Sequence, residues 1–344
     1  MKANNMLSLS NIQKKSRNQS IDLVKIIAMF MVMALHTFIG KTQTLFISCL
    51  SIMSGIAIPL FFMVSGFLMW NRNVDYKYAL KKIFGIVRFV AIICLMYYII
   101  FILPKGFDYI DFLKLFFGSF VQRSYMPVFW YFGAMCLIYA LLPAIYRFGL
   151  RNNNLPIYSF LILMCIVFVT FILNITIKFE KSYILQTFRI WNWLFYFMIG
   201  CFFKSIYTER GTFFSMETRK HCFFALPIVI IAYIIFVKIT KTYLLGIEYY
   251  FGSTLCWIYA TLVFILCLTL KIQDNKFITM MSKCFLPVYA IHEIVIRHIV
   301  NKLHFVDYFG EYYPIFDYIL VVSISILLSL AIMKLPYSNK IFKI

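Results

Sequence analysis

The chain alternates long apolar runs with short polar connections. A helix needs about 20 mostly apolar residues to cross the hydrocarbon core of a bilayer, and ten runs meet this requirement. They predict ten transmembrane helices, at residues 21–39, 45–69, 83–103, 128–146, 156–177, 190–207, 222–239, 248–270, 280–300 and 314–335. Because the connections are short, the pattern indicates an all-α, polytopic helix bundle that forms one domain over residues 1–344, with a basic tail at 1–20.

The composition excludes a soluble protein. Hydrophobic residues make up 63% of the 344 residues, against roughly 45–50% in soluble domains, and a bilayer solvates this excess. A formal charge of +20 is also typical of nucleic-acid binding. The Lys and Arg residues, however, are spread over the connections and form no continuous basic stretch, so we expect no nucleic-acid partner. The nine cysteines have no metal-ligand or redox spacing, which favours packing roles and no metal site.

The orientation follows from the basic residues at the span ends. On the side that holds both termini, tails and connections carry 20 Lys and Arg residues, against 11 on the other side. Connections rich in Lys and Arg stay in the cytoplasm, so both termini are predicted to be cytoplasmic. The first run lacks a small-residue cleavage site and is expected to remain as an anchor.

Three ionisable residues lie within the first predicted helix, where such groups are costly and indicate function. The eleven-residue step from Lys25 to His36 rotates by about 20° net and rises about 16 Å, so both share one stripe with Asp22. Asp22 and Lys25 are also consistent with an interfacial ion pair whose lysine extends to the headgroups. A structural histidine that bonds a neighbouring helix is the alternative for His36.

The second predicted helix contains Pro59, which implies a kink, and the pair Ser65-Gly66, which allows close backbone approach. Taken alone, Ser65 is more typical of a packing residue than of a nucleophile. The third helix follows Lys81 and Lys82 and carries Arg88 deeper inside. These basic groups suit a phosphate-rich cytoplasmic ligand, although ordinary positive-inside charge explains the two lysines equally well.

The ninth predicted helix places Tyr289 and His292 three residues apart, and therefore on one face. Glu293 and Arg297 lie four apart and are interpreted as neutralising each other. His298 approaches the outer connection and is not expected to have a special role.

These segments together resemble the acyltransferase 3 family of membrane O-acyltransferases that modify bacterial surface glycans. The resemblance covers essentially the whole chain in order. Its motifs correspond to Asp22 and Lys25 followed by His36, Phe61-Phe62-Met63-Val64-Ser65-Gly66-Phe67, Trp130-Tyr131 through Leu142-Pro143, Phe195-Tyr196-Phe197-Met198-Ile199-Gly200, and Tyr289-Ala290-Ile291-His292. The chain departs from the family in having Lys25 where an Arg is usual, and in lacking a clean Arg-x-x-Arg before the third helix.

The resemblance implies a multi-pass protein of the bacterial cytoplasmic membrane that transfers an acyl group, most often acetyl, from cytoplasmic acyl-CoA to a sugar hydroxyl. His36 would act as general base or acyl carrier, supported by His292 and Tyr289. Lys25, Lys82 and Arg88 would hold the phosphates of the donor. No permanently bound cofactor is implied.

Two other hypotheses fit parts of the pattern. Intramembrane His, Lys and Asp on helices interrupted by Pro also suit a transporter or exporter of a glycan intermediate or small polar solute, although no inverted repeat is evident. A purely structural membrane protein fits poorly with ionisable groups in three helices. The sequence leaves the acceptor open among capsular polysaccharide, lipid-linked repeat unit, wall polymer and small metabolite.

Overall fold

The computed structural model of the chain describes residues 17–41, 44–70, 74–106, 109–149, 155–210, 215–240, 246–270, 272–303, 305–336 and 338–342. Within these ranges the chain is almost entirely helical and contains no strand. The predicted all-α fold is therefore confirmed. Most of the predicted basic tail, residues 1–16, lies outside the described ranges.

Each of the ten predicted spans coincides with helical structure. Among the described residues, eight helical segments are long and apolar enough to cross a membrane, and two more, at Ile190–Ile206 and Thr254–Thr269, are apolar but shorter. The spans correspond to α1 (Gln19–Phe38), α2 and α3 (Leu45–Met53 and Ala57–Met69), α4 (Tyr76–Tyr97), α6 (Trp130–Gly149), α7 (Leu155–Ile177), α9 (Ile190–Arg210), α10 (Met216–Thr240), α11 (Thr254–Thr269), α12 (Lys276–His298) and α14 (Tyr313–Lys334).

Short helices occupy several connections. They are α5 (Tyr109–Phe120), α8 (Phe179–Tyr183), α13 (Val306–Phe309) and α15 (Ser338–Ile341). The hydrophobic pattern did not predict α5. It packs against α4 and α6, so the connection after the third span is a folded part of the bundle.

The irregularity in the second span lies one turn before the proline that predicted it. A 3₁₀ segment at Ser54–Ile56 separates α2 from α3, and Pro59 is the third residue of α3. Proline has no N–H and cannot bond the carbonyl of Gly55, four residues earlier, so the helical ladder is interrupted there.

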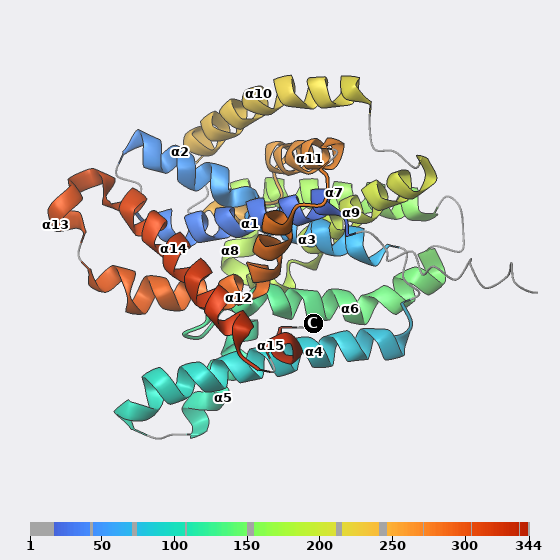
Figure 1. The fold of residues 1–344 in the computed structure, drawn as a ribbon. Coiled ribbons are helices and arrows are strands. Elements are labelled where there is room, and N and C mark those ends of the chain that lie inside the picture. The colour runs from blue at the N-terminus through green and yellow to red at the C-terminus, as the bar shows by residue number, and fades with distance from the viewer. Residues whose placement is uncertain are drawn as a thin grey trace, which may run out of the picture.

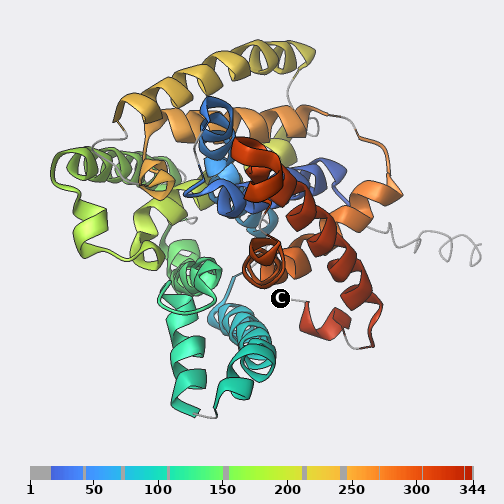
Figure 2. The same ribbon diagram turned by 90° about the vertical axis from the view of Figure 1, so that its left-hand side faces the viewer.

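The helices that carry the candidate residues lie inside the bundle. Figures 1 and 2 show α10 along one edge and α4 with α5 along the opposite edge. Between them, α1 packs against α3 and α12, and α3 packs against α9.

The contact of α3 with α9 requires glycine on both sides. A Cβ on Gly66 would lie 1.9 Å from the Phe197 carbonyl oxygen, and one on Gly200 would lie 1.9 Å from that of Met63. The close approach predicted at Ser65-Gly66 is thus present, with Gly200 as the partner.

Candidate active site

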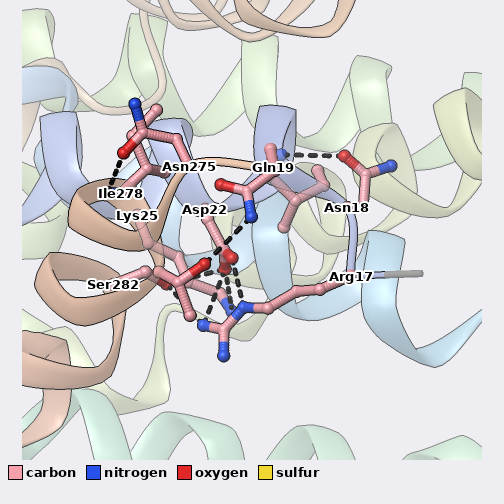
Figure 3. A network of polar contacts seen from close by, with 10 residues as sticks. Arg17, Asn18, Gln19, Asp22, Lys25, Asn275, Ile278 and Ser282 are labelled. Atoms are coloured by element: carbon pink, nitrogen blue, oxygen red, sulfur yellow. Dashed lines mark hydrogen bonds and ion pairs between the residues drawn. The ribbon is translucent and has the colours of Figure 1, made fainter. Parts of the chain in front are cut away.

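Two polar clusters join α1 to α12. The first, here called the inner cluster, consists of Arg17, Asp22, Lys25 and Ser282, near the start of both helices (Figure 3). The buried Asp22 carboxylate accepts from Arg17 Nε, from Arg17 Nη2 at 3.1 Å and from Ser282 Oγ at 2.7 Å. Lys25 Nζ lies 3.4 Å from the same carboxylate. Each oxygen of this buried group is therefore partnered, as the cost of burying a charge requires.

Lys25 thus forms the ion pair with Asp22 that the sequence offered as an alternative. Two cations share one carboxylate, so the inner cluster keeps one net positive charge. The Arg17 side chain is 38% exposed and the Lys25 side chain 21%. A positive charge with access to solvent is still available for an anionic ligand, and the donor role of Lys25 stays a prediction.

The second cluster, here called the histidine cluster, consists of His36, His292, Glu293 and Arg297. His36 Nδ1 on α1 lies 3.6 Å from Glu293 Oε2 on α12. The other carboxylate oxygen, Oε1, accepts from Arg297 Nε at 2.5 Å. The distance to His36 exceeds a hydrogen bond, but catalytic contacts are often long in free enzymes and shorten when substrate binds. The His36 side chain is 26% exposed and Glu293 9%, so the imidazole borders accessible space over a buried carboxylate.

This arrangement favours one nitrogen of His36 as the base. A carboxylate only accepts, so the contact with Glu293 favours the proton on Nδ1 and leaves the lone pair on Nε2. A carboxylate behind an imidazole also stabilises the imidazolium that forms when Nε2 takes a proton. The sequence interpretation paired Glu293 only with Arg297. Its contact with His36 was missed, because the pairing of α1 with α12 is not visible in the sequence.

His292 lies beside His36, with ring centroids 5.2 Å apart. Its Nδ1 lies 2.9 Å from the Tyr289 carbonyl oxygen and 3.2 Å from that of Val288. Carbonyls only accept, so Nδ1 carries the proton and Nε2 carries a lone pair. This Nε2 atom is buried and has no hydrogen-bond partner among the described residues. A buried acceptor without a protein partner is costly, so this nitrogen is a candidate acceptor for a hydroxyl group.

The same cluster has the composition of a metal site. Ligand atoms of His36, His292 and Glu293 all lie within 4.8 Å of one another, and two histidines with one carboxylate is a ligand set that zinc accepts. An ion held there would occupy the atoms that a base and its supporting carboxylate need. The expectation of no metal, drawn from the cysteine spacing, did not consider this combination and stays a prediction.

Tyr289 and Ser65 bond other groups. The Tyr289 hydroxyl donates to the Val128 carbonyl oxygen, and its ring centroid lies 5.8 Å from that of His292. Ser65 Oγ donates to the Phe61 carbonyl oxygen at 2.9 Å and lies 3.1 Å from the Tyr131 hydroxyl. Both residues therefore hold helices together next to the histidine cluster.

The basic residues of α4 are placed separately from the inner cluster. Arg88 is exposed, and its Nη2 donates to the Lys340 carbonyl oxygen of α15 at 3.0 Å. The next residue, Phe89, packs against Phe342 with ring centroids 5.7 Å apart. The C-terminal segment thus covers part of the α4 face that carries Arg88. Lys82 lies over the Tyr78 ring at 5.7 Å.

One apolar cavity of about 390 Å³ lies away from both clusters. Residues of α7, α9 and α11 line it together with Gly252. None of the candidate residues borders it, so it plays no part in the site.

One of the comparisons with known proteins identifies a family. The family model Acyl_transf_3, described as an acyltransferase domain, matches residues 18–334. No curated protein and no solved structure matches the chain significantly. The match spans α1 through α14 and includes the histidine cluster and all of the inner cluster except Arg17. The chain is therefore a multi-pass membrane protein that belongs to the acyltransferase 3 family.

Proposed function

We propose that the protein transfers an acyl group, most often acetyl, from cytoplasmic acyl-CoA to a hydroxyl of a cell-surface or capsular polysaccharide or of its lipid-linked precursor. Membership of an acyltransferase family supports the reaction type. The observation that carries the proposal is the contact between His36 and Glu293, which provides an oriented base inside a membrane bundle.

The reaction follows from the tautomer assigned to His36. Nε2 takes the proton of the acceptor hydroxyl while its oxygen forms a bond to the thioester carbonyl carbon. The carbon–sulfur bond then breaks, and the CoA thiolate leaves and receives the proton from His36. Glu293, oriented by Arg297, stabilises the imidazolium between these two steps. His292 Nε2 accepts a hydrogen bond from the bound acceptor.

The donor side rests on charge and distance. His36 lies 11 residues beyond Lys25 on α1, which is about 16 Å along the helix axis. An extended pantetheine arm suits this separation between phosphates at the inner cluster and a thioester at His36. Lys25, Lys82 and Arg88 are the proposed phosphate ligands, and the bacterial cytoplasmic membrane is the proposed location.

A measurement of transfer and export together tests the proposal. Membranes that contain wild-type protein receive labelled acetyl-CoA, and ester label on glycan is followed alongside total exported glycan. His36→Ala should insert normally and export normally, while glycan ester falls by about 10²–10⁴-fold. If this variant blocks export and the surviving surface glycan keeps its full acyl content, the protein is a transporter.

A further inference from the structure

A third cluster lies where α4 and α12 end, on the side that the charge count predicts to be outer. This outer aromatic cluster consists of Tyr97, Phe101, Tyr125 and His298. The His298 ring stacks on Phe101 with centroids 3.8 Å apart and 19° between the planes. Its Nε2 lies 3.1 Å from the Tyr97 hydroxyl oxygen, and the Tyr125 ring stacks on Tyr97 with centroids 6.2 Å apart and 25° between the planes. Four rings from three distant parts of the chain therefore meet here.

The cluster has a buried centre and an accessible rim. Tyr97 is 4% exposed, whereas Tyr125 is 60% exposed. Phe101 and His298 are half-buried. The exposed surface thus combines flat apolar ring faces with the polar edges of a phenol and an imidazole.

The contacts of the cluster distinguish it from a membrane aromatic belt, whose rings sit at the headgroup level to anchor spans. Arg297, next to His298 in the chain, is hydrogen-bonded to Glu293 and has a side chain that is 37% exposed. Arg297 therefore links Glu293 to a partly exposed position at the end of α12. The four rings themselves pack around the buried Tyr97 and do not stand singly at the membrane surface.

The backbone around the cluster is irregular in two places. After Tyr97 the α-helix changes to a π-helical segment at Tyr98–Ile102, which carries Phe101. Gln122, three residues before Tyr125, has φ of 64°, a left-handed conformation that is uncommon outside glycine. Such departures from regular geometry occur often at functional sites, and here both position rings of one cluster.

We propose that the outer aromatic cluster binds a sugar of the acceptor, next to the sugar that is acylated. Pyranose rings present C–H faces that pack on aromatic rings and hydroxyl edges that bond polar groups, and this rim offers both. A bound acyl chain would contact only the apolar ring faces and would leave the polar edges of this rim unused, so the rim suits a sugar better. This inference rests on the proposed glycan acceptor and specifies where and how that acceptor is held.

The spacing along α12 sets a lower limit on the size of the acceptor. His292 lies beside His36, and His298 follows six residues later. This step rises about 9 Å along the helix axis and turns about 240° around it, so the two histidines are separated by more than this rise. This is longer than one hexose ring. A sugar stacked on the cluster therefore leaves room for a second sugar at His36, so the acceptor has at least two sugar units.

The test compares acceptors of two lengths. Purified protein receives labelled acetyl-CoA with p-nitrophenyl glycosides of glucose, galactose and N-acetylglucosamine, and with the corresponding disaccharides. Tyr125→Ala should raise the KM for disaccharides by about 3- to 10-fold, as expected for one lost stacking contact. The KM for monosaccharides and for acetyl-CoA should not change. Tyr125→Phe keeps the ring and loses only the hydroxyl, so it should raise the KM for disaccharides less than Tyr125→Ala does.

Tyr109→Ala is the matched control. Tyr109 is 65% exposed, is the first residue of α5, the helix that precedes Tyr125, and is not part of the cluster. Equal disaccharide KM values for Tyr125→Ala and Tyr109→Ala would overturn the subsite. Equal effects on monosaccharides and disaccharides would overturn the length argument and the subsite with it. If wild-type protein acylates none of the glycosides, this result contradicts the glycan acceptor of the proposed function. It differs from the two results above, which contradict the subsite while the glycan acceptor stands.

Discussion

The inner cluster and the histidine cluster are built by the same two helices, α1 and α12, and differ in how far their polar groups are satisfied. In the inner cluster, Asp22 bonds Arg17 and Ser282 and lies within ion-pair distance of Lys25. In the histidine cluster, His292 Nε2 is buried without a partner, and His36 lies 3.6 Å from its carboxylate.

A polar group with all its bonds made contributes stability and has little left to offer a ligand. A buried group with an unused lone pair costs stability and is available for chemistry. The comparison therefore assigns the Asp22 carboxylate of the inner cluster to holding α1 against α12, with the surplus positive charge at Lys25 left for the donor, and the histidine cluster to acyl transfer. The following variants test this division, from the largest expected effect to the smallest.

Glu293→Gln should lower the turnover number by about 10²–10⁴-fold, because an amide does not stabilise the His36 imidazolium and no longer fixes its tautomer. The thermal unfolding midpoint in detergent should fall less than in Asp22→Asn, because Glu293 pairs with one partly exposed arginine, whereas Asp22 pairs with two cations. Acetyl transfer at saturating acetyl-CoA is the measurement. Turnover equal to wild type would remove Glu293 from the mechanism.

Asp22→Ala should cost about 3–5 kcal/mol of folding free energy, because it leaves Arg17 and Lys25 without their shared carboxylate. Asp111→Ala is the control. Its pair with Lys114 is exposed, with side chains 71% and 46% accessible, so it should cost less than about 1 kcal/mol. Equal losses of stability in both variants would contradict a structural role for the inner cluster.

Lys25→Gln should weaken acetyl-CoA binding by about 10- to 150-fold, which corresponds to one charge-assisted contact of about 1.5–3 kcal/mol. Asp22 keeps Arg17 and Ser282, so the variant should fold. Lys25→Arg should be tolerated, because it supplies the fork usual in the family. Unchanged donor affinity in purified Lys25→Gln would limit Lys25 to its ion pair.

The sequence predicted the fold well because the signal for a membrane helix is local. Length and hydrophobicity placed ten predicted spans on helical structure, and eight helices of the described residues are long and apolar enough to cross a membrane. Gly66 correctly predicted a close helix contact. The sequence predicted the break in the second span at Pro59, whereas it lies one turn earlier, because the proline cannot bond the carbonyl four residues before it. The helix α5 was missed, since it is too short for a span.

The candidate site depended on contacts between distant segments, and these were only partly predictable. The stripe of Asp22, Lys25 and His36 follows from helical periodicity, so their shared face could be expected. The meeting of His36 with Glu293 could not, because it depends on the packing of α1 against α12. His298 was expected to have no special role, yet it lies at the centre of ring contacts with Tyr97 and Phe101.

The division between the two clusters is tested most directly by turnover per folded molecule in His36→Gln and Asp22→Asn, at saturating acetyl-CoA and with the unfolding midpoint measured on the same samples. His36→Gln should keep the wild-type midpoint and lose at least about 10²-fold in turnover. Asp22→Asn should unfold at a lower temperature and keep most of its turnover. Wild-type turnover in folded His36→Gln, or an equal loss of turnover in both variants, would contradict the account.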